Sequence, residues 1–359
     1  MALRDRRRAL GPSYMERNRV TEDFSREDYT VGWICALAPE LAAAAAMLDE
    51  TYAPPAAFQQ DLNDSNVYSY GRMGRHKVVI ASLGAGMPGK VPASTTATNL
   101  LRSFPKIRFG LMVGIGGGIP AKTAEDSADD IRLGDVVVSV PHGESGGVVQ
   151  YDHGKIVHEG QFVQTGSLGK PPTILLKAVQ RVQAQHDIQE SGIPELIGKI
   201  LQDRPKMAVK YRRPDAEDRL YQAQYEHPAG TKNCSRCDAR YLMQRPARDS
   251  EEPVIHYGLI GSADRVMLHG PTRDYLRTAK NIICLEMEAA GLMDNFPCLV
   301  IRGISDYADT HKSDRWHGYA SIVAAGYAKE LLTFVPELTR EPTAVELMPP
   351  GRWINSRRK

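Results

Sequence analysis

Two apolar runs near the C-terminal end, separated by one short segment, most constrain what this chain can fold into. IICLEM (282–287) and CLVIRGI (298–304) are of strand length and almost uniformly apolar. Strands of that kind are buried on both faces, which is typical of an α/β sheet with helices on both sides. EAAGLMDN (288–295) is helix-prone, and Pro297 ends it. We therefore expect strand, short helix, strand.

A carboxylate follows each of these two expected strands. Glu288 comes after the first and Asp306 after the second. Ligands of open α/β sheets bind at the carboxyl ends of the strands, so we expect both acids at a ligand site, one strand apart. Two acids there suit a hydroxylated substrate with one group to be protonated. Taken singly, Glu288 could instead cap its helix and Asp306 could satisfy a loop.

The paired motifs M-E-A-A-G (287–291) and R-G-I-S-D (302–306) resemble those of the purine nucleoside phosphorylase and nucleosidase superfamily. The chain is similar in particular to nucleoside-phosphorylase-like domains of filamentous fungi. The resemblance is specific because both motifs occur together, and it runs from about residue 29 to about residue 336. It implies that Glu288 binds the ribose hydroxyls, that Met287 packs on the sugar, and that Asp306 protonates the leaving purine at N7.

The resemblance implies further site residues in three other segments and beside Asp306. GIGGGIP (114–120) would line the ribosyl and phosphate region, GAGMPGK (84–90) the other wall, and GSADRVMLHGPTRD (261–274) the purine edge. From the residues alone, the glycines could form an amide nest or only a tight turn, and the last segment a loop–helix cap. The substrate-binding candidates, beyond Glu288 and Met287, are Gly86, Gly116, Gly117, Ser262, Asp264, Arg302, which would hold the acid, and Ser305, which would orient Asp306.

The turn after the first expected strand distinguishes phosphate from water as the nucleophile. Phosphorylases of this superfamily carry a Gly-Asp-Pro turn and a nearby arginine there, whereas this chain reads WICALAPEL (33–41). That turn has no guanidinium fork, the group that matches phosphate. Glu40 resembles the acid that orients the attacking water in methylthioadenosine/S-adenosylhomocysteine nucleosidases. Glu40 also suits the positive end of the helix dipole, which we expect to keep it ionised.

These residues and the resemblance predict a purine nucleosidase that hydrolyses the N-glycosidic bond to free base and ribose. Asp306 would be the general acid, Glu288 would bind the 2′ and 3′ hydroxyls, and Glu40 would direct a water. No cofactor is required. The alternatives are a phosphate-dependent phosphorylase that uses Arg75 or Arg102, a nucleosidase acting on ATP or another nucleotide, and a non-catalytic nucleoside-sensing module.

Expected strands and helices alternate along most of the chain, which predicts one α/β domain over 29–336. Its centre would be a mixed, twisted β-sheet flanked by helices. We expect strands at 29–37, 109–120, 132–141 and 254–267, a hairpin at 66–84 with Gly71 and Gly74 as turn residues, and helices at 93–104 and 317–335.

Three segments depart from this alternation. Residues 183–252 are rich in Gln, Arg, Pro and charge and hold one expected helix at 193–203, so we expect a partly ordered insert. Residues 1–28 and 337–359 lack periodicity and are expected to be disordered tails.

Composition points to a soluble protein with a small-molecule partner. With 42% hydrophobic residues and a formal charge of +2, the chain gives no reason to expect a nucleic-acid or membrane partner. It has no secretory signal, so we expect a cytoplasmic homo-oligomer that binds a purine nucleoside. Of its five cysteines, Cys234 and Cys237 form a Cys-x2-Cys pair. Because no second pair follows and His227 and His256 are poorly spaced, we expect two free thiols and no metal.

Overall fold

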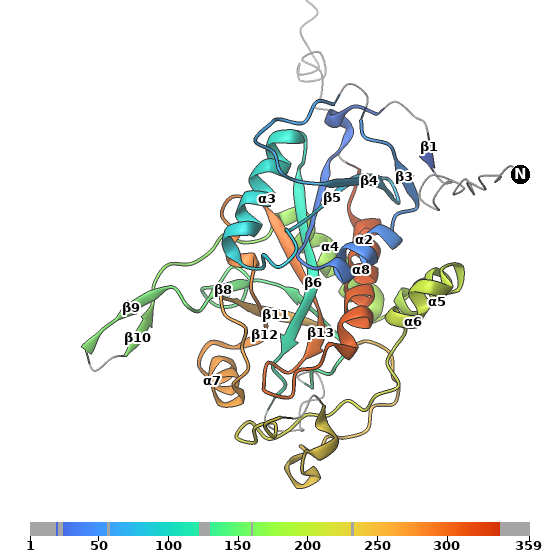
Figure 1. The fold of residues 1–359 in the computed structure, drawn as a ribbon. Coiled ribbons are helices and arrows are strands. Elements are labelled where there is room, and N and C mark those ends of the chain that lie inside the picture. The colour runs from blue at the N-terminus through green and yellow to red at the C-terminus, as the bar shows by residue number, and fades with distance from the viewer. Residues whose placement is uncertain are drawn as a thin grey trace, which may run out of the picture.

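The computed structural model describes residues 19–20, 24–55, 58–121, 130–158, 161–230 and 233–337. An 11-stranded mixed sheet forms its centre, with helices on both faces (Figure 1), which confirms the predicted α/β class. The order of the strands is β1 (Arg19–Val20), β3 (Glu50–Tyr52), β4 (Tyr68–Met73), β5 (His76–Ser82), β2 (Val31–Cys35), β6 (Phe109–Gly118), β12 (Ile282–Glu286), β11 (Ile255–Ser262), β7 (Val136–Ser139) and β13 (Cys298–Asp306), with β8 (Val148–Gln150) paired to β11.

Strand β6 organises the sheet because it pairs with three others. It runs parallel to β2 at its start and parallel to β13 along most of its length, from Gly110 to Gly117. At its far end it is antiparallel to β12, where Gly118 lies opposite Cys284. Since β12, β11, β7 and β13 are also joined in that order, five strands close into a ring around the end of β6. The carboxyl ends of β12 and β13 therefore lie on either side of β6, one strand apart as predicted.

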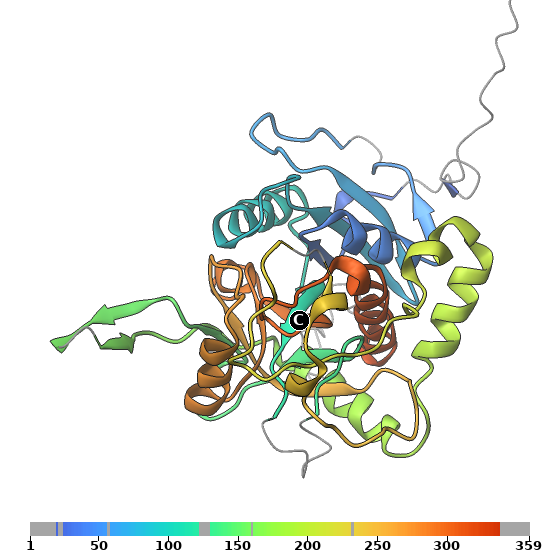
Figure 2. The same ribbon diagram turned by 60° about the horizontal axis from the view of Figure 1, so that its bottom comes forward.

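The helices form two layers. One face of the sheet is covered by α2 (Ala38–Ala46), α4 (Thr173–His186), α5 (Ile193–Asp203), α6 (Pro205–Tyr211) and α8 (His317–Phe334), and the other by α3 (Lys90–Ser103) (Figures 1 and 2). Helix α7 (Gly270–Lys280) packs next to β12. The 3-10 turns are η1 (Arg26–Asp28), η4 (Cys234–Arg236), η5 (Ala239–Tyr241), η6 (Ala289–Gly291) and η7 (Asp314–Trp316).

Strand β2 shows why the predicted strands are uniformly apolar. Val31, Trp33 and Cys35 join the core shared with α2 and α8, whereas Ile34 points into the core shared with α3. All of these side chains are fully buried. Alternate residues of a strand face opposite sides, so a strand between two helical layers must be apolar at every position.

Two local predictions are wrong. The hairpin of β4 and β5 turns at Gly74, which has φ +58°, but Gly71 lies inside β4. A Cβ at Gly71 would come within 2.3 Å of the Glu50 carbonyl oxygen, so the glycine there permits close strand packing. The segment 288–295 forms only the turn η6 instead of a helix. Its first N–H groups donate to the Glu286 carboxylate rather than to a helical ladder.

The 183–252 segment contributes to the core. Its predicted helix is α5, with the predicted bounds, but the end of α4 and all of α6 also lie there. Ile193, Ile197 and Ile200 bury their side chains in the core that includes α8. The polar composition reflects the outer faces of these helices and paired charges, such as Arg248 with the buried Asp135.

The ordered domain begins before residue 29. Strand β1 pairs in parallel with β3, and Phe24 packs on Tyr52 with their ring centroids 4.6 Å apart. Residues 1–18, 21–23 and 338–359 of the predicted tails lie outside the described residues. Within the described part of the chain, no helix is both long and apolar enough to cross a membrane.

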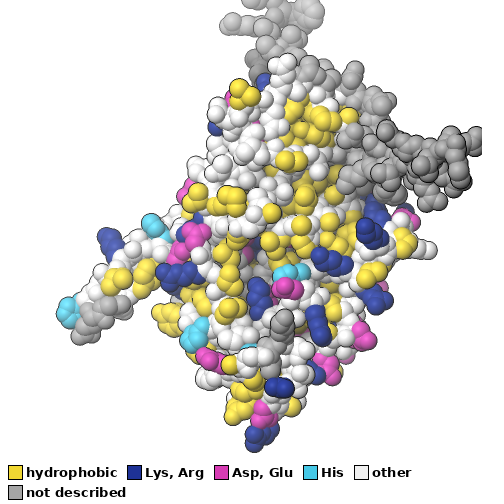
Figure 3. All heavy atoms as spheres, in the orientation of Figure 1, with side chains coloured by type: hydrophobic (Ala, Val, Ile, Leu, Met, Phe, Trp, Pro, Cys, Tyr) yellow, Lys and Arg dark blue, Asp and Glu magenta, His cyan; other side chains and the backbone are white. Residues whose placement is uncertain are grey.

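A two-stranded arm projects from the body of the domain (Figure 1). Strands β9 (Gly154–Ile156) and β10 (Phe162–Gln164) pair antiparallel and form a separate sheet. The exposed face of the molecule in Figure 3 carries hydrophobic side chains along this arm and charges of both signs over the lower body. Phe162 and Val163 are each 43% exposed, so the arm buries little apolar surface within the chain.

Candidate active site

A cavity of about 230 Å³ lies at the ends of β6, β12 and β13. Glu40, Glu288 and Asp306 all line it, so the structure brings together the three acids that the sequence singled out. They reach the cavity from different elements: the first turn of α2, the residue pair after β12, and the last residue of β13. Other predicted site residues that line it are Met287, Gly116, Gly117, Arg302 and Ser305.

Arg302 is the electrostatic centre of the site. It points from β13 and is 1% exposed. Its Nη2 donates to the Glu286 carboxylate and lies 3.4 Å from Glu288 Oε2, while Nη1 donates to the Ile115 carbonyl oxygen at 3.3 Å. The buried guanidinium therefore compensates neighbouring glutamates, which would otherwise be unpaired charges. The prediction that Arg302 holds Asp306 is wrong, since Arg302 holds Glu286 and Glu288.

Glu288 sits in the wall of the cavity with a protonation equilibrium near neutrality. Its Oε1 accepts a hydrogen bond from the Gly89 N–H at 3.3 Å, and the carboxylate is 5% exposed. Burial raises the pKa of Glu288 to about 7, and Arg302 opposes that rise. Gly89 precedes α3, so this contact joins the two sides of the cavity. A nearly buried carboxylate at the cavity wall is suited to accept hydrogen bonds from hydroxyl groups.

Glu40 is held by three backbone N–H groups. Its Oε2 accepts from Ala36 at 2.7 Å and from Leu37 at 2.8 Å, and its Oε1 accepts from Ile115 at 2.8 Å. Glu40 thus closes the start of its own helix, and it lines the cavity as well. Burial raises the pKa of Glu40 by more than the Arg302 charge and the three hydrogen bonds lower it. That the helix dipole keeps Glu40 ionised stays a prediction, and burial opposes it.

Asp306 is oriented by its own neighbours in the chain. Ser305 Oγ donates to Asp306 Oδ2 at 3.0 Å, as predicted, and the Ala308 N–H donates to Oδ1 at 2.9 Å. Lys312 Nζ lies 3.1 Å from Oδ2. The carboxyl group is 4% exposed and is fixed from both oxygens, which gives it one orientation at the cavity.

The glycines of β6 allow these acids to approach. A Cβ at Gly114 would lie 2.4 Å from Glu40 Oε1 and 2.5 Å from Arg302 Nη1, and one at Gly117 would lie 2.9 Å from Asp306 Oδ1. The cluster is a continuous strand, so the predicted turn or amide nest is wrong. Its glycines are needed because side chains cross directly over the strand.

Three predicted substrate-binding residues lie elsewhere. Gly86 is in an exposed turn, Ser262 Oγ accepts from the Ala290 N–H at 3.0 Å, and Asp264 pairs with Lys90 at 3.3 Å. Among the described residues that line the cavity, the same two segments are represented instead by Pro88 and by Arg265, Val266 and Met267. Substrate contacts of Gly86, Ser262 and Asp264 stay predictions.

Three residues that the sequence did not indicate also line the cavity: Glu286, Lys312 and His317. Glu286 was detectable, because residues i and i+2 of a strand face the same side and E-M-E places two acids there. Lys312 and His317 reach the cavity from the loop after β13 and from the start of α8, and no spacing rule predicts that approach. Burial lowers the pKa of His317, which favours the neutral imidazole.

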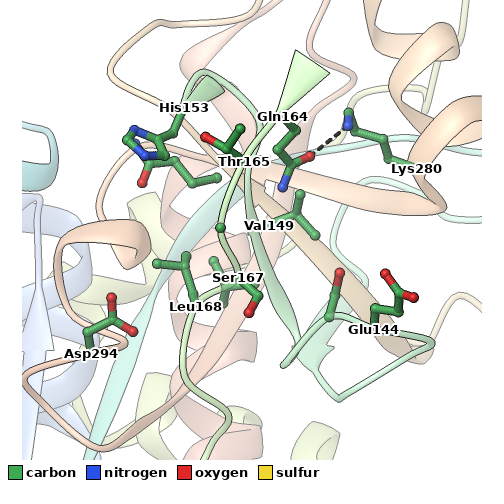
Figure 4. Close-up of a pocket in the computed structure, with 13 residues that line it drawn as sticks. Glu144, Val149, His153, Gln164, Thr165, Ser167, Leu168, Lys280 and Asp294 are labelled. Carbon is green, nitrogen blue, oxygen red and sulfur yellow. Dashed lines mark hydrogen bonds between the residues drawn. The ribbon is translucent and has the colours of Figure 1, made fainter. Parts of the chain in front are cut away.

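A second, larger cavity of about 640 Å³ lies at the base of the β9–β10 arm (Figure 4). His153, Gln164, Lys280 and Asp294 are among its lining residues. Lys280 Nζ donates to Gln164 Oε1 at 2.6 Å. Glu40, Glu288 and Asp306 do not line this cavity, so its chemistry is separate from that of the three acids.

His227 lies beside the Cys-x2-Cys pair, although its spacing in the sequence does not match a zinc motif. The ligand atoms of His227, Cys234 and Cys237 all lie within 4.8 Å of one another. Sequence spacing alone did not reveal this proximity. The other histidine, His256, has its Nε2 atom 2.9 Å from Oδ2 of the buried Asp135.

Comparisons with known proteins agree with this geometry. A family model described as the phosphorylase superfamily matches residues 30–333. The chain is 41% identical over 317 residues to a nucleotide-binding leucine-rich repeat (NLR)-like protein of Hyaloscypha variabilis. The matched region covers 88% of this chain and 30% of that protein. It therefore spans less than a third of that relative.

Nucleosidases are also similar to the chain. It is 27% identical over 315 residues to a 5′-methylthioadenosine/S-adenosylhomocysteine nucleosidase of Mycobacterium bovis, covering 86% of this chain and 98% of that protein. A similar fold is found in the solved structure of the nucleosidase of that name from Neisseria meningitidis, in complex with methylthio-immucillin-A. The TM-score is 0.52 and the identity 18%, and the match covers 84% of this chain and 98% of that one. That structural likeness concerns the fold.

Proposed function

The chain belongs to the phosphorylase superfamily, and we propose that it is a purine nucleosidase that hydrolyses the N-glycosidic bond of its substrate. The single observation that supports this most is the meeting of Glu40, Glu288 and Asp306 in one cavity. The similarity to nucleosidases over most of the chain supports the same reaction.

Each acid has one role in the proposed reaction. The bond between the ribose C1′ and the purine N9 breaks, and its electron pair goes to the base. Asp306 gives its proton to the base at N7, so that the purine leaves as a neutral molecule. Ionised Glu288 accepts hydrogen bonds from the ribose hydroxyls and stabilises the positive charge that develops on the sugar. A water adds to C1′ and gives up one proton, which Glu40 receives.

The hydrogen bonds of Glu40 support water as the nucleophile. Each carboxylate oxygen accepts about two hydrogen bonds, and the backbone uses two on Oε2 but only one on Oε1. Oε1 can therefore accept one more, from a water in the cavity. A raised pKa makes Glu40 a better proton acceptor than an ordinary carboxylate.

The pairing of the cations that line the cavity supports water over phosphate as the nucleophile. Arg302 is engaged by glutamates and Lys312 by Asp306, while Arg265 is exposed at the rim. Of the described residues that line the cavity, none is Arg75 or Arg102. A phosphate bound beside Glu40 would meet a carboxylate without a bidentate partner.

The substrate class is tested by incubating the protein with adenosine, inosine, guanosine, methylthioadenosine and ATP in phosphate-free buffer. Free base is then measured by chromatography. We expect base to be released from at least one purine nucleoside. Binding without release from every compound would contradict the proposal and favour a nucleoside-sensing module.

A further inference from the structure

Two thiols and an imidazole meet outside the proposed active site. Cys234 and Cys237 lie at the start and immediately after the end of the 3-10 turn η4, in which the Cys237 N–H donates to the Cys234 carbonyl oxygen at 3.2 Å. The Asn233 side chain accepts from the Ser235 N–H at 3.1 Å and fixes the start of the turn. The turn places the two sulfur atoms on one side, and His227 lies against them, with all three ligand atoms within 4.8 Å of one another.

This donor set is one that zinc prefers. A Cys-x2-Cys turn with a histidine is typical of structural zinc sites, where the ligand atoms lie about 3.5 to 4 Å apart around the metal. The three ligand atoms lie within 4.8 Å of one another, close to that spacing. The His227 Nδ1 lies 3.1 Å from the Pro228 carbonyl oxygen. In the tautomer that donates to this carbonyl, Nε2 is the ring nitrogen that would bind a metal.

A second imidazole lies close to these three ligand groups. His311 lies beside the cluster, with its ring centroid 5.5 Å from that of His227, and its side chain is 5% exposed. Neither of its ring nitrogens has a hydrogen-bond partner among the described residues.

We propose that His227, Cys234 and Cys237 bind one Zn²⁺ ion, with water or His311 in the fourth position. The site would be structural. The backbone N–H of His227 donates to Thr310 Oγ1 at 2.8 Å. The His311 ring stacks on the Tyr221 ring, with their centroids 4.1 Å apart. The metal would thus fasten the end of the 183–252 segment onto the loop between Asp306 and Lys312.

The test is the metal content of the full chain, purified without a metal-affinity step and dialysed against buffered Zn²⁺. Mass spectrometry of the metals should find about one zinc per chain. Cys234→Ser and His227→Ala should each lower zinc affinity more than about 100-fold, because even the loss of an outer-shell partner costs 10- to 100-fold. Ser235→Ala, an exposed position in the same turn, should retain zinc.

Two further measurements separate the outcomes. Replacing Zn²⁺ by Co²⁺ should give the visible absorption of a tetrahedral thiolate site in the parent and not in Cys237→Ser. If a variant does not fold, a thiol-specific reagent added to the folded parent should release the zinc. Parent protein that stays free of zinc, a Cys234–Cys237 disulfide in the purified chain, or equal zinc in Cys234→Ser would overturn the proposal.

Discussion

Arg302 determines how three carboxylates can occupy one buried site. Its guanidinium contacts Glu286 and Glu288 directly, and its charge also lowers the pKa of Glu40 against the effect of burial. Glu286 further accepts from the Glu288 and Ala289 N–H groups. The single charge of Arg302 does not cancel the effect of burial, so the pKa values of Glu288 and Glu40 stay raised. Raised pKa values suit carboxylates that gain or share protons during a reaction.

Asp306→Asn keeps the shape of the side chain but removes its acidic proton. Loss of a general acid should lower the rate of purine release by about 10² to 10⁴. Steady-state release of free base measures the effect. Asp203→Asn, at the exposed end of α5, is a matched control and should leave the rate unchanged. An Asp306→Asn variant within a few-fold of the parent would remove Asp306 from the mechanism.

Glu288 should give stability and activity opposite dependences on pH. Its pKa is about 7 in the folded protein against an ordinary 4.5, so between these values the folded state binds a proton that the unfolded chain has released. This contribution is fully present below pH about 4.5 and is lost as the pH rises through about 7. Activity should rise over the same range, because the ionised form binds the sugar.

Glu288→Gln tests both trends, because glutamine does not titrate. The free energy of unfolding in urea should fall from pH 5 to pH 8 by more in the parent than in the variant. The variant should also lose the rise in kcat/KM near neutral pH. Parallel stability curves for the two proteins would show that Glu288 titrates at its ordinary pKa.

At the scale of the elements, the sequence predicts most strands because burial on both faces leaves an unbroken apolar run. The ring formed by β6, β12, β11, β7 and β13 was not predictable, since the register of β6 with two partners depends on contacts far apart in the chain. The same limit applies to the site: E-M-E and S-D can be recognised locally, whereas Lys312 and His227 reach their positions through loops.

Gly114→Ala tests whether β6 must lack side chains where Glu40 and Arg302 cross it. The new methyl group would lie 2.4 Å from Glu40 Oε1 and 2.5 Å from Arg302 Nη1. Displacing either group should lower the free energy of unfolding by about 1 to 3 kcal/mol, measured in urea. Gly198→Ala, in helix α5 with open space around it, should be neutral or stabilising by up to about 1 kcal/mol. Equal stability of both variants would show that the crossing is not tight.

At the scale of the whole molecule, the 183–252 segment belongs to the domain core. Its composition predicted an insert because surface charge and proline outnumber the few apolar positions of α5 and α6. Those positions are buried against the rest of the core, and the segment also supplies Arg248 to the buried Asp135. The polar average of a segment therefore does not reveal whether a few of its residues are buried.

Ile197→Ala should destabilise the whole domain. Ile197 is 6% exposed, and its Cδ1 would lie 3.8 Å from a Cβ at Gly326 of α8. Loss of a buried isoleucine side chain costs about 2 to 5 kcal/mol, which a urea unfolding curve would show as a lower midpoint. Ile188→Ala, 81% exposed, is the control and should change stability by less than about 0.5 kcal/mol. A similar small change for Ile197→Ala would mean that the insert is peripheral.

The most direct test of the proposed function is the identity of the sugar product. The parent protein is incubated with its best purine nucleoside in phosphate-free buffer and again with phosphate in the millimolar range. Because Glu40 lines the cavity and the Arg302 guanidinium there is engaged by Glu286 and Glu288, we predict free ribose at the same rate in both. Ribose 1-phosphate, formed at a rate that rises in proportion to phosphate, would contradict hydrolysis and restrict Glu40 to closing the start of its helix.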